Sequence, residues 1–130
     1  MNLDKEKLKN FEKLPADVRR EFSLLMNQYG QKKKESHIKS DFMSFVKHVW
    51  PDFIEGSHHK EVAKKFNEIA EGKIKRVIIN MAPRHTKSEF ASYLLPAWMV
   101  GRNPKLKIIQ STNTTELSVR FGRKAKALMD

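Results

Sequence analysis

The segment 83–88, with the sequence Pro-Arg-His-Thr-Lys-Ser, brings together side chains suited to binding phosphate. The apolar run at 76–81 before it predicts a buried strand, and the residues from 87 to 100 predict a helix. Strand, tight loop, Lys-Ser and helix are the layout of a phosphate-binding P-loop. Loop N–H groups and a helix N-terminus attract anionic oxygens. In this layout Lys87 contacts the terminal phosphates of a nucleotide and Ser88 ligates Mg²⁺.

The glycines of the usual P-loop pattern are missing, because Met81 and Thr86 occupy their two positions. Glycine is favoured there since it tolerates positive φ and lets the backbone approach a ligand closely. Two interpretations are open from the motif alone. Either the loop reaches phosphate with other backbone angles, or it is a turn that merely contains Lys and Ser.

The charge of the chain narrows its class of partner. The 130 residues carry 26 Lys and Arg against 15 Asp and Glu, a formal net charge of +11. Such an excess predicts a polyanionic partner, and nucleic acid is favoured because the basic residues cluster. There is no cysteine, which excludes disulfides and thiolate metal sites. No apolar run approaches the roughly 18 residues of a membrane span, so we expect a soluble intracellular protein without membrane contact.

Helical periodicity dominates the first half of the chain. Residues 2–29 predict two helices separated at Pro15, the second ending at Gly30, and 31–39 is the best candidate for a linker. Ser40 and Ser57 are candidate caps of two further helices. Asn113 or Thr114 is expected to cap a final, basic helix, which carries Arg120, Arg123, Lys124 and Lys126.

Two predicted strands, 76–81 and 106–111, flank the helix that follows the loop, and Pro96 is expected to kink or shorten that helix. Strand, crossover helix and strand predict a parallel, right-handed βαβ unit. The fold class is therefore expected to be α/β: N-terminal helices, then the first βαβ of a P-loop NTPase (RecA-like) sheet. Parallel sheets normally have more strands, so the sheet is incomplete and the chain is expected to be the front of a larger protein.

The segment from about Phe45 to Met129 resembles the N-terminal ATPase region of the large terminase subunit of tailed bacteriophages. The resemblance rests on the motifs 45–51 (Phe-Val-Lys-His-Val-Trp-Pro), 58–59 (His-His), 75–89, 95–98 (Leu-Pro-Ala-Trp), 101–104 (Gly-Arg-Asn-Pro) and 120–123 (Arg-Phe-Gly-Arg). In some terminases Pro-Arg-His-Thr-Lys-Ser is a characteristic variant of the P-loop. The resemblance therefore favours the phosphate-binding interpretation of the loop, despite the missing glycines.

Terminase large subunits are ATP-driven motors that thread double-stranded DNA into a procapsid. The resemblance implies ATP and Mg²⁺ as cofactors, and double-stranded DNA, the portal protein and the small terminase subunit as partners. It also implies a homo-oligomeric ring of the full-length protein in the host cytoplasm. The nuclease domain and the acidic magnesium-binding strand of the family have no counterpart here. We therefore expect nucleotide binding by this chain, but neither DNA cutting nor complete ATP hydrolysis.

The same resemblance assigns roles to residues. Arg84 looks like an arginine finger or nucleotide sensor, so Arg84 and Lys87 are the expected catalytic residues. An adenine pocket is expected upstream of the loop, with Trp50 and His58 as its candidate contacts and His59 beside them. The expected cofactor-binding residues are Pro83, Arg84, His85, Thr86, Lys87, Ser88, Trp50 and His58, with Ser88 as the magnesium ligand.

Three segments follow from these assignments: an N-terminal helical segment at 1–35, a helical segment before the P-loop at 36–74, and the start of an ATPase core at 75–130. Two other functions remain open. The chain could be a non-enzymatic basic module that binds nucleic acid or a partner protein, or a helicase-type P-loop ATPase. The first alternative predicts DNA binding that depends on salt but not on Lys87.

Overall fold

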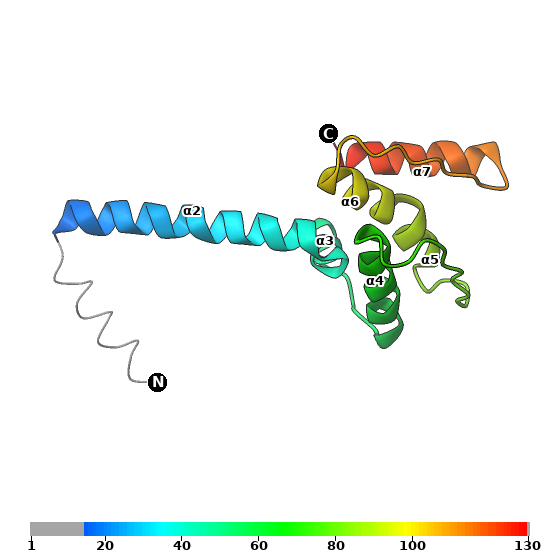
Figure 1. Cartoon of the computed structure of the whole chain (residues 1–130), viewed down its shortest axis with the longest axis horizontal. Coiled ribbons are helices and arrows are strands. Elements are labelled where there is room, and N and C mark those ends of the chain that lie inside the picture. Colours follow the sequence, from blue (N-terminus) through cyan, green and yellow to red (C-terminus); the bar gives the residue numbers. More distant parts are fainter. Residues whose placement is uncertain (1–14, 130) are drawn as a thin grey trace. The chain divides into compact units, whose positions relative to one another are not determined.

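The computed structural model describes residues 15–129, drawn as ribbons in Figure 1. Residues 1–14 and Asp130 lie outside the described part, and so does the first of the two predicted N-terminal helices. The chain divides into two units, Met1–Ser36 and His37–Asp130. Every residue that the motif analysis singled out as a candidate site lies in the second unit.

Helix α2 spans Ala16–Ser40 and has no buried residue. It continues through Gly30 and through 31–39, so the predicted helix end and the predicted linker were both wrong. The segment after Gly30 is rich in Gln, Lys and Glu, which are good helix formers. Their propensity outweighs the roughly 1 kcal/mol that one glycine costs in a helix interior.

The second unit contains a series of shorter helices. They are α3 (Phe42–Val49), α4 (Ser57–Ala70), α5 (Lys87–Glu89), the π-helix η1 (Phe90–Leu94), α6 (Leu95–Arg102) and α7 (Thr115–Ala127). The predicted caps were displaced by one residue at α3 and α4, whose N-caps are Asp41 and Gly56. The predicted cap Thr114 of α7 is confirmed, because its side chain accepts the N–H of Leu117.

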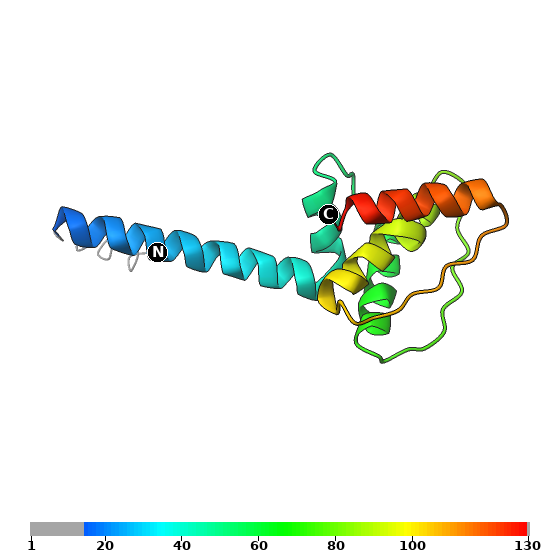
Figure 2. The ribbon, with the colours of Figure 1, turned by 90° about the horizontal axis from the view of Figure 1, so that it is seen from above.

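The α/β fold class is wrong for this structure. The described residues 15–129 contain no strand and no sheet, and the segments 76–81 and 106–111 are irregular connections, which Figure 2 shows as open traces. Ile78 is 89% exposed and Ile109 is 98% exposed. The sequence offers only two candidate strands, and an isolated two-stranded pair is marginally stable at best in water. Neither predicted strand forms, and the predicted βαβ unit is therefore absent from residues 15–129.

Pro96 does not shorten the helix that contains it. The helical backbone continues to Arg102, and the turn immediately before Leu95 widens to the π form, with the N–H of Leu95 bonded to the carbonyl of Phe90. A proline ring clashes with the carbonyl four residues earlier in a regular α-helix. The wider turn contains that carbonyl, at Ser92, and so provides a physical reason for the π geometry.

Phe42 is the centre of the core of the second unit. Its side chain is fully buried and meets three other rings edge-on: Phe66 of α4 at 5.0 Å, Phe90 of η1 at 5.4 Å and Trp98 of α6 at 5.4 Å between centroids. Each edge-to-face pair adds about 0.5–1.5 kcal/mol beyond the area that it buries. One side chain of α3 therefore joins the helix before the loop to the helix after it.

The replacement Phe42→Ala is expected to lower the free energy of unfolding by about 3–5 kcal/mol, because it removes three ring contacts and leaves a cavity. Denaturant unfolding followed by tryptophan fluorescence measures the change, since Trp98 is buried against Phe42. The matched control is Ile78→Ala at an exposed apolar position, with an expected change within about 0.5 kcal/mol. Equal losses in the two variants would contradict the central place of Phe42.

Candidate phosphate-binding loop

The backbone of the loop takes left-handed conformations at residues that are not glycine. Arg84 has φ of 66° and Thr86 has φ of 58°. Thr86 stands where the usual pattern has its second glycine, and it adopts a conformation that glycine adopts without strain. Such a conformation costs an ordinary residue about 1–2 kcal/mol. The loop thus has glycine-like geometry at this position without glycine, which requires a stabilising contact elsewhere.

Thr86 is the N-cap of α5, so the first helical residue is Lys87. The first N–H groups of a helix have no intrahelical partner, and the side chain of Thr86 does not cap them. Its hydroxyl donates to the carbonyl of His85 instead, at 2.7 Å. The helix start therefore leaves backbone donors to solvent or to an anion.

A hollow of about 430 Å³ lies at this helix start. It is lined by Ala82, Pro83, Arg84, Thr86, Lys87, Ser88 and Glu89. The donors of this lining are the side chains of Arg84, Lys87 and Ser88, whereas the Thr86 O–H already donates to the carbonyl of His85. This donor set fits phosphate oxygens, and the Ser88 hydroxyl fits a Mg²⁺ ion that arrives with them.

The ammonium group of Lys87 folds back over the loop. Its Nζ lies 3.4 Å from the carbonyl oxygen of Met81, which is a long and therefore weak hydrogen bond. An anion in the hollow can replace this partner at little cost. The loop also contains a contact of its own, between His85 Nδ1 and the carbonyl of Pro83 at 2.9 Å.

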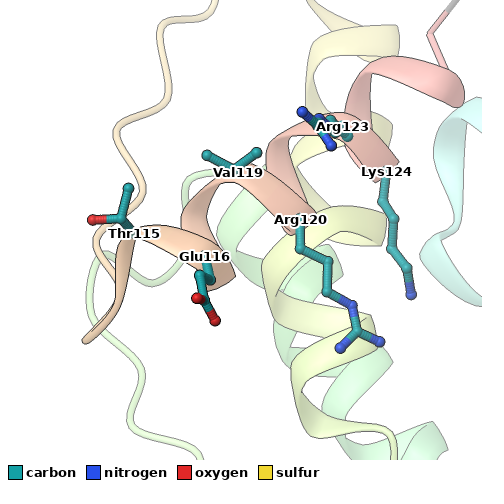
Figure 3. A pocket seen from close by; sticks show the side chains of 6 residues that line it. All are labelled: Thr115, Glu116, Val119, Arg120, Arg123 and Lys124. Atoms are coloured by element: carbon teal, nitrogen blue, oxygen red, sulfur yellow. The ribbon is translucent and has the colours of Figure 1, made fainter.

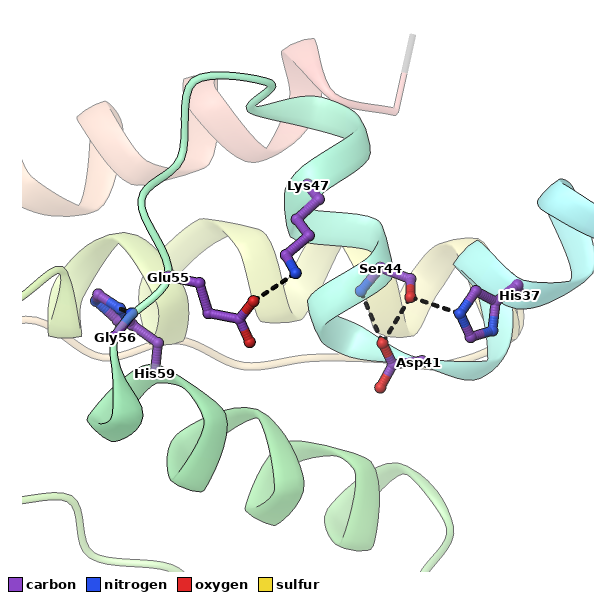
Figure 4. Close-up of polar contacts among 7 residues, drawn as sticks. All are labelled: His37, Asp41, Ser44, Lys47, Glu55, Gly56 and His59. Atoms are coloured by element: carbon purple, nitrogen blue, oxygen red, sulfur yellow. Dashed lines mark hydrogen bonds and ion pairs between the residues drawn. The ribbon is translucent and has the colours of Figure 1, made fainter.

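His59 connects the first turn of α4 to the loop. Its Nδ1 accepts a hydrogen bond from the N–H of Gly56 at 2.9 Å, and Figure 4 shows the two residues side by side. Its Nε2 lies 2.8 Å from Thr86 Oγ1. Because Nδ1 accepts, the ring proton is on Nε2, and Nε2 donates to Thr86. Thr86 then donates to His85, which completes a directed chain of three hydrogen bonds.

The surroundings of His59 favour its neutral form. Burial, and then the neighbouring His58 and His85, lower its pKa from the ordinary value of 6.5, while Glu55 acts weakly in the opposite direction. Only 7% of the residue is exposed. A neutral ring is also what the hydrogen-bond chain requires.

The predicted adenine contacts lie in different surroundings. The ring of His58 lies 3.8 Å from that of His59 and 5.4 Å from that of His85 between centroids, so His58 packs between these two rings. The ring of Trp50 packs on Phe53 at 5.3 Å. Trp50 and His58 are not among the residues that line the hollow. The structure thus gathers residues 83–88, except His85, around the hollow; His58 packs against His85 instead, and Trp50 lies one aromatic layer away.

Glu89 is a residue of the hollow that the motif did not identify. Its carboxylate is paired with Lys124 of α7 at 3.1 Å, and the same ammonium lies 4.8 Å from the ring centroid of Tyr93. Lys124 therefore offsets a negative charge that would otherwise repel phosphate. Its position directly after Lys-Ser could have marked Glu89 as a residue of the site. Its pairing with Lys124 could not be read from the sequence, because the two residues are 35 positions apart.

The remaining basic residues of α7 border a second, shallow hollow of about 560 Å³, which Figure 3 shows. Arg120 and Lys124 extend to one side of the helix and Arg123 to the other. Thr115, Glu116 and Val119 complete the lining. Lys124 is engaged by Glu89, so Arg120 and Arg123 are the better candidates for contacts with an external anion.

Three further observations concern known relatives, metal sites and membrane spans. A scan of protein-family models, a search of curated proteins and a search of solved structures each found no significant match. Within the described residues 15–129, no group of three or more His, Asp or Glu side chains is arranged to hold a metal ion. None of the helices described in this chain combines the length and the apolar character that crossing a membrane requires.

The burial of Tyr93, together with its contact with Glu89, predicts that Tyr93 titrates late. Burial, the charge of Glu89 and a hydrogen bond with Glu89 raise the pKa of Tyr93 to about 12. The stabilisation of its neutral form is complete below the ordinary value of 10.0 and is lost as the pH rises through the raised value. We expect Glu89→Gln to lower the Tyr93 pKa toward 10.0, measured by the ultraviolet absorbance of the phenolate.

Assignment of this titration uses two conservative variants. Tyr93→Phe should remove the late step, whereas Tyr29→Phe, in α2, should leave it unchanged. A late step that persists in Tyr93→Phe would show that the step does not belong to Tyr93, and an unchanged Tyr93 pKa in Glu89→Gln would contradict the effect of that contact.

Proposed function

We propose that the loop at 83–88 binds the phosphates of ATP together with Mg²⁺. One observation carries the proposal: Arg84, Lys87 and Ser88 line a single hollow at a helix start whose N-cap has glycine-like backbone geometry. Lys87 supplies a point charge, and the planar guanidinium of Arg84 supplies a fork of donors for phosphoryl oxygens. The Ser88 hydroxyl would ligate the metal ion that bridges the phosphates.

We further propose that the chain is the ATP-binding N-terminal part of a phage terminase large subunit. The support is the resemblance of the motifs between Phe45 and Met129, the net charge of +11 and the loop chemistry. In this proposal the partners are double-stranded DNA, the portal protein and the small terminase subunit. The full-length protein would act as a ring in the host cytoplasm, where ATP supplies the phosphoryl group whose transfer drives packaging.

The proposal for the described residues is limited to nucleotide binding. Hydrolysis also requires a group that orients the attacking water. Glu89 is the carboxylate nearest in sequence to Lys87 and Ser88, and it is held by Lys124. We therefore assign no hydrolytic step to these residues.

Titration calorimetry with ATP and Mg²⁺ tests the loop directly. Lys87→Ala is expected to weaken binding about 10- to 100-fold, because a hydrogen bond to a charged group contributes about 1.5–3 kcal/mol. Lys64→Ala, which removes an exposed lysine of α4 outside the hollow, is the matched control and should bind like the wild type. Equal heats from the wild type and Lys87→Ala would contradict the proposal.

The basic face of α7 supports a second candidate function, the binding of nucleic acid without any role for nucleotide. Arg120 and Arg123 border an open hollow, whose lining also includes the carboxylate of Glu116, as Figure 3 shows. In this case DNA affinity would fall with salt and would be indifferent to ATP and to Lys87→Ala. The two candidates therefore differ in their response to the same variant.

A filter-binding salt series on duplex DNA distinguishes them. We expect the Arg120→Ala, Arg123→Ala double variant to reduce the slope of log affinity against log salt by about two, because each lost phosphate contact removes about one unit. Repeating the series with ATP and with Lys87→Ala decides whether nucleotide matters. An unchanged slope in the double variant would exclude Arg120 and Arg123 as phosphate contacts.

A further inference from the structure

The left-handed conformation of Thr86 needs a source of stabilisation that the loop itself does not provide. Its hydroxyl is 2.8 Å from His59 Nε2, on a helix that begins 29 residues earlier in the chain. Its own donated bond goes to the adjacent carbonyl of His85, which cannot by itself fix the hydroxyl relative to the rest of the fold. The contact with His59 is thus the connection between the threonine side chain and the core.

The ring of His59 is itself fixed from several directions. Phe53 and Phe90 pack on it at 4.8 Å and 5.3 Å between ring centroids. The N–H of Gly56 fixes its Nδ1, and Gly56 is so close that a methyl group there would lie 3.4 Å from this nitrogen and 2.8 Å from Cε1 of His58. Such a ring has one available tautomer and one available orientation.

We propose that His59 is the positioning residue of the phosphate loop, holding Thr86 in the left-handed conformation from which the helix starts at Lys87. The proposal rests on the proposed function in one respect, the identity of phosphate as the ligand of the loop. It assigns His59 a role through Thr86 rather than a contact with adenine. Without this bond the loop amides at 85–87 would sample other conformations, and the anion would have to order them on binding.

The charges around His59 set the sign of its pH dependence. His58 of α4 and His85 of the loop face it, and both become repulsive when protonated. Glu55 is the facing carboxylate, and it is already paired with Lys47 of α3, as Figure 4 shows. Because an imidazolium cannot accept the N–H of Gly56, protonation breaks the chain that fixes Thr86. The positioning effect is therefore complete above pH 6.5 and is lost as the pH falls through the lowered pKa of His59.

Two readouts test the proposal on the full chain. The first is the hydrogen-exchange protection factor, by NMR, of the amide of Phe90, whose N–H is bonded to the carbonyl of Thr86 at 2.9 Å; this measurement requires no ligand. The second is the affinity for inorganic tripolyphosphate by calorimetry. Both are measured near pH 7.5 and at a second pH below the lowered pKa of His59, which an NMR titration of its ring locates.

Two variants of His59 distinguish the loss of its N–H donor from the loss of its titratable ring. His59→Gln keeps an N–H donor near the position of Nε2 but does not titrate, whereas His59→Leu has no donor. We expect the wild-type protection factor to fall about five- to tenfold at the lower pH, the factor that one hydrogen bond contributes. His59→Gln should keep near-wild-type protection at both values, and His59→Leu should be low at both. His48→Gln, at an exposed histidine of α3, is the control and should behave like the wild type.

The affinities decide the link to phosphate. His59→Leu is expected to bind tripolyphosphate about five- to tenfold more weakly than wild type near pH 7.5, with rescue by His59→Gln. Wild-type protection factors in His59→Leu would overturn the positioning role. If the wild type binds no tripolyphosphate while protection still depends on His59, the proposed function fails and the structural role of His59 stands.

Discussion

The edge-on packing of Phe42 against Phe66, Phe90 and Trp98 is the interaction on which the site depends. Phe66 lies in the helix that carries His59, and Phe90 follows the three residues of α5. The contact of one α3 side chain with both rings therefore fixes α4 relative to the helix that starts at Lys87. The hydrogen bond of 2.8 Å between His59 and Thr86 joins α4 to the start of α5, and it would be broken by a shift of about an ångström between the two helices.

Much of the helical part of this fold could be predicted from the sequence, because apolar side chains at three-to-four spacing mark α3, α4 and α7 and the threonine before α7 is a good cap. Two features could not. The segments at 76–81 and 106–111 have the composition of strands, but strand formation depends on partners that a local pattern does not contain. The stretch after Gly30 has the composition of a polar linker, and only its propensity, rather than any burial, makes it helical.

In the candidate site, too, features that depend on neighbouring residues could be predicted, whereas contacts between residues far apart in the sequence could not. Lys87 and Ser88 could be identified because they are adjacent and begin a helix. His59 was expected beside the adenine contacts, but its bond to Thr86 could not be predicted, since that partner is 27 residues away. The pairing of Glu89 with Lys124 was hidden for the same reason. The missing glycine, which counted against the motif, turned out to be a threonine with glycine-like backbone geometry.

The π turn at Phe90–Leu94 changes the angle, around the helix axis, between the side chains of α5 and those of α6. A turn closed by a bond to the fifth residue accommodates one residue more than an α-turn, and each residue of an α-helix advances the chain by about 100° around the axis. The extra residue thus acts as an angular offset between Trp98, which faces the core, and Lys87, which faces the hollow. Shortening this stretch by a single residue would leave both ends helical and rotate the lysine away from its loop, so the length of 90–94 is as much a part of the site as the side chains in it.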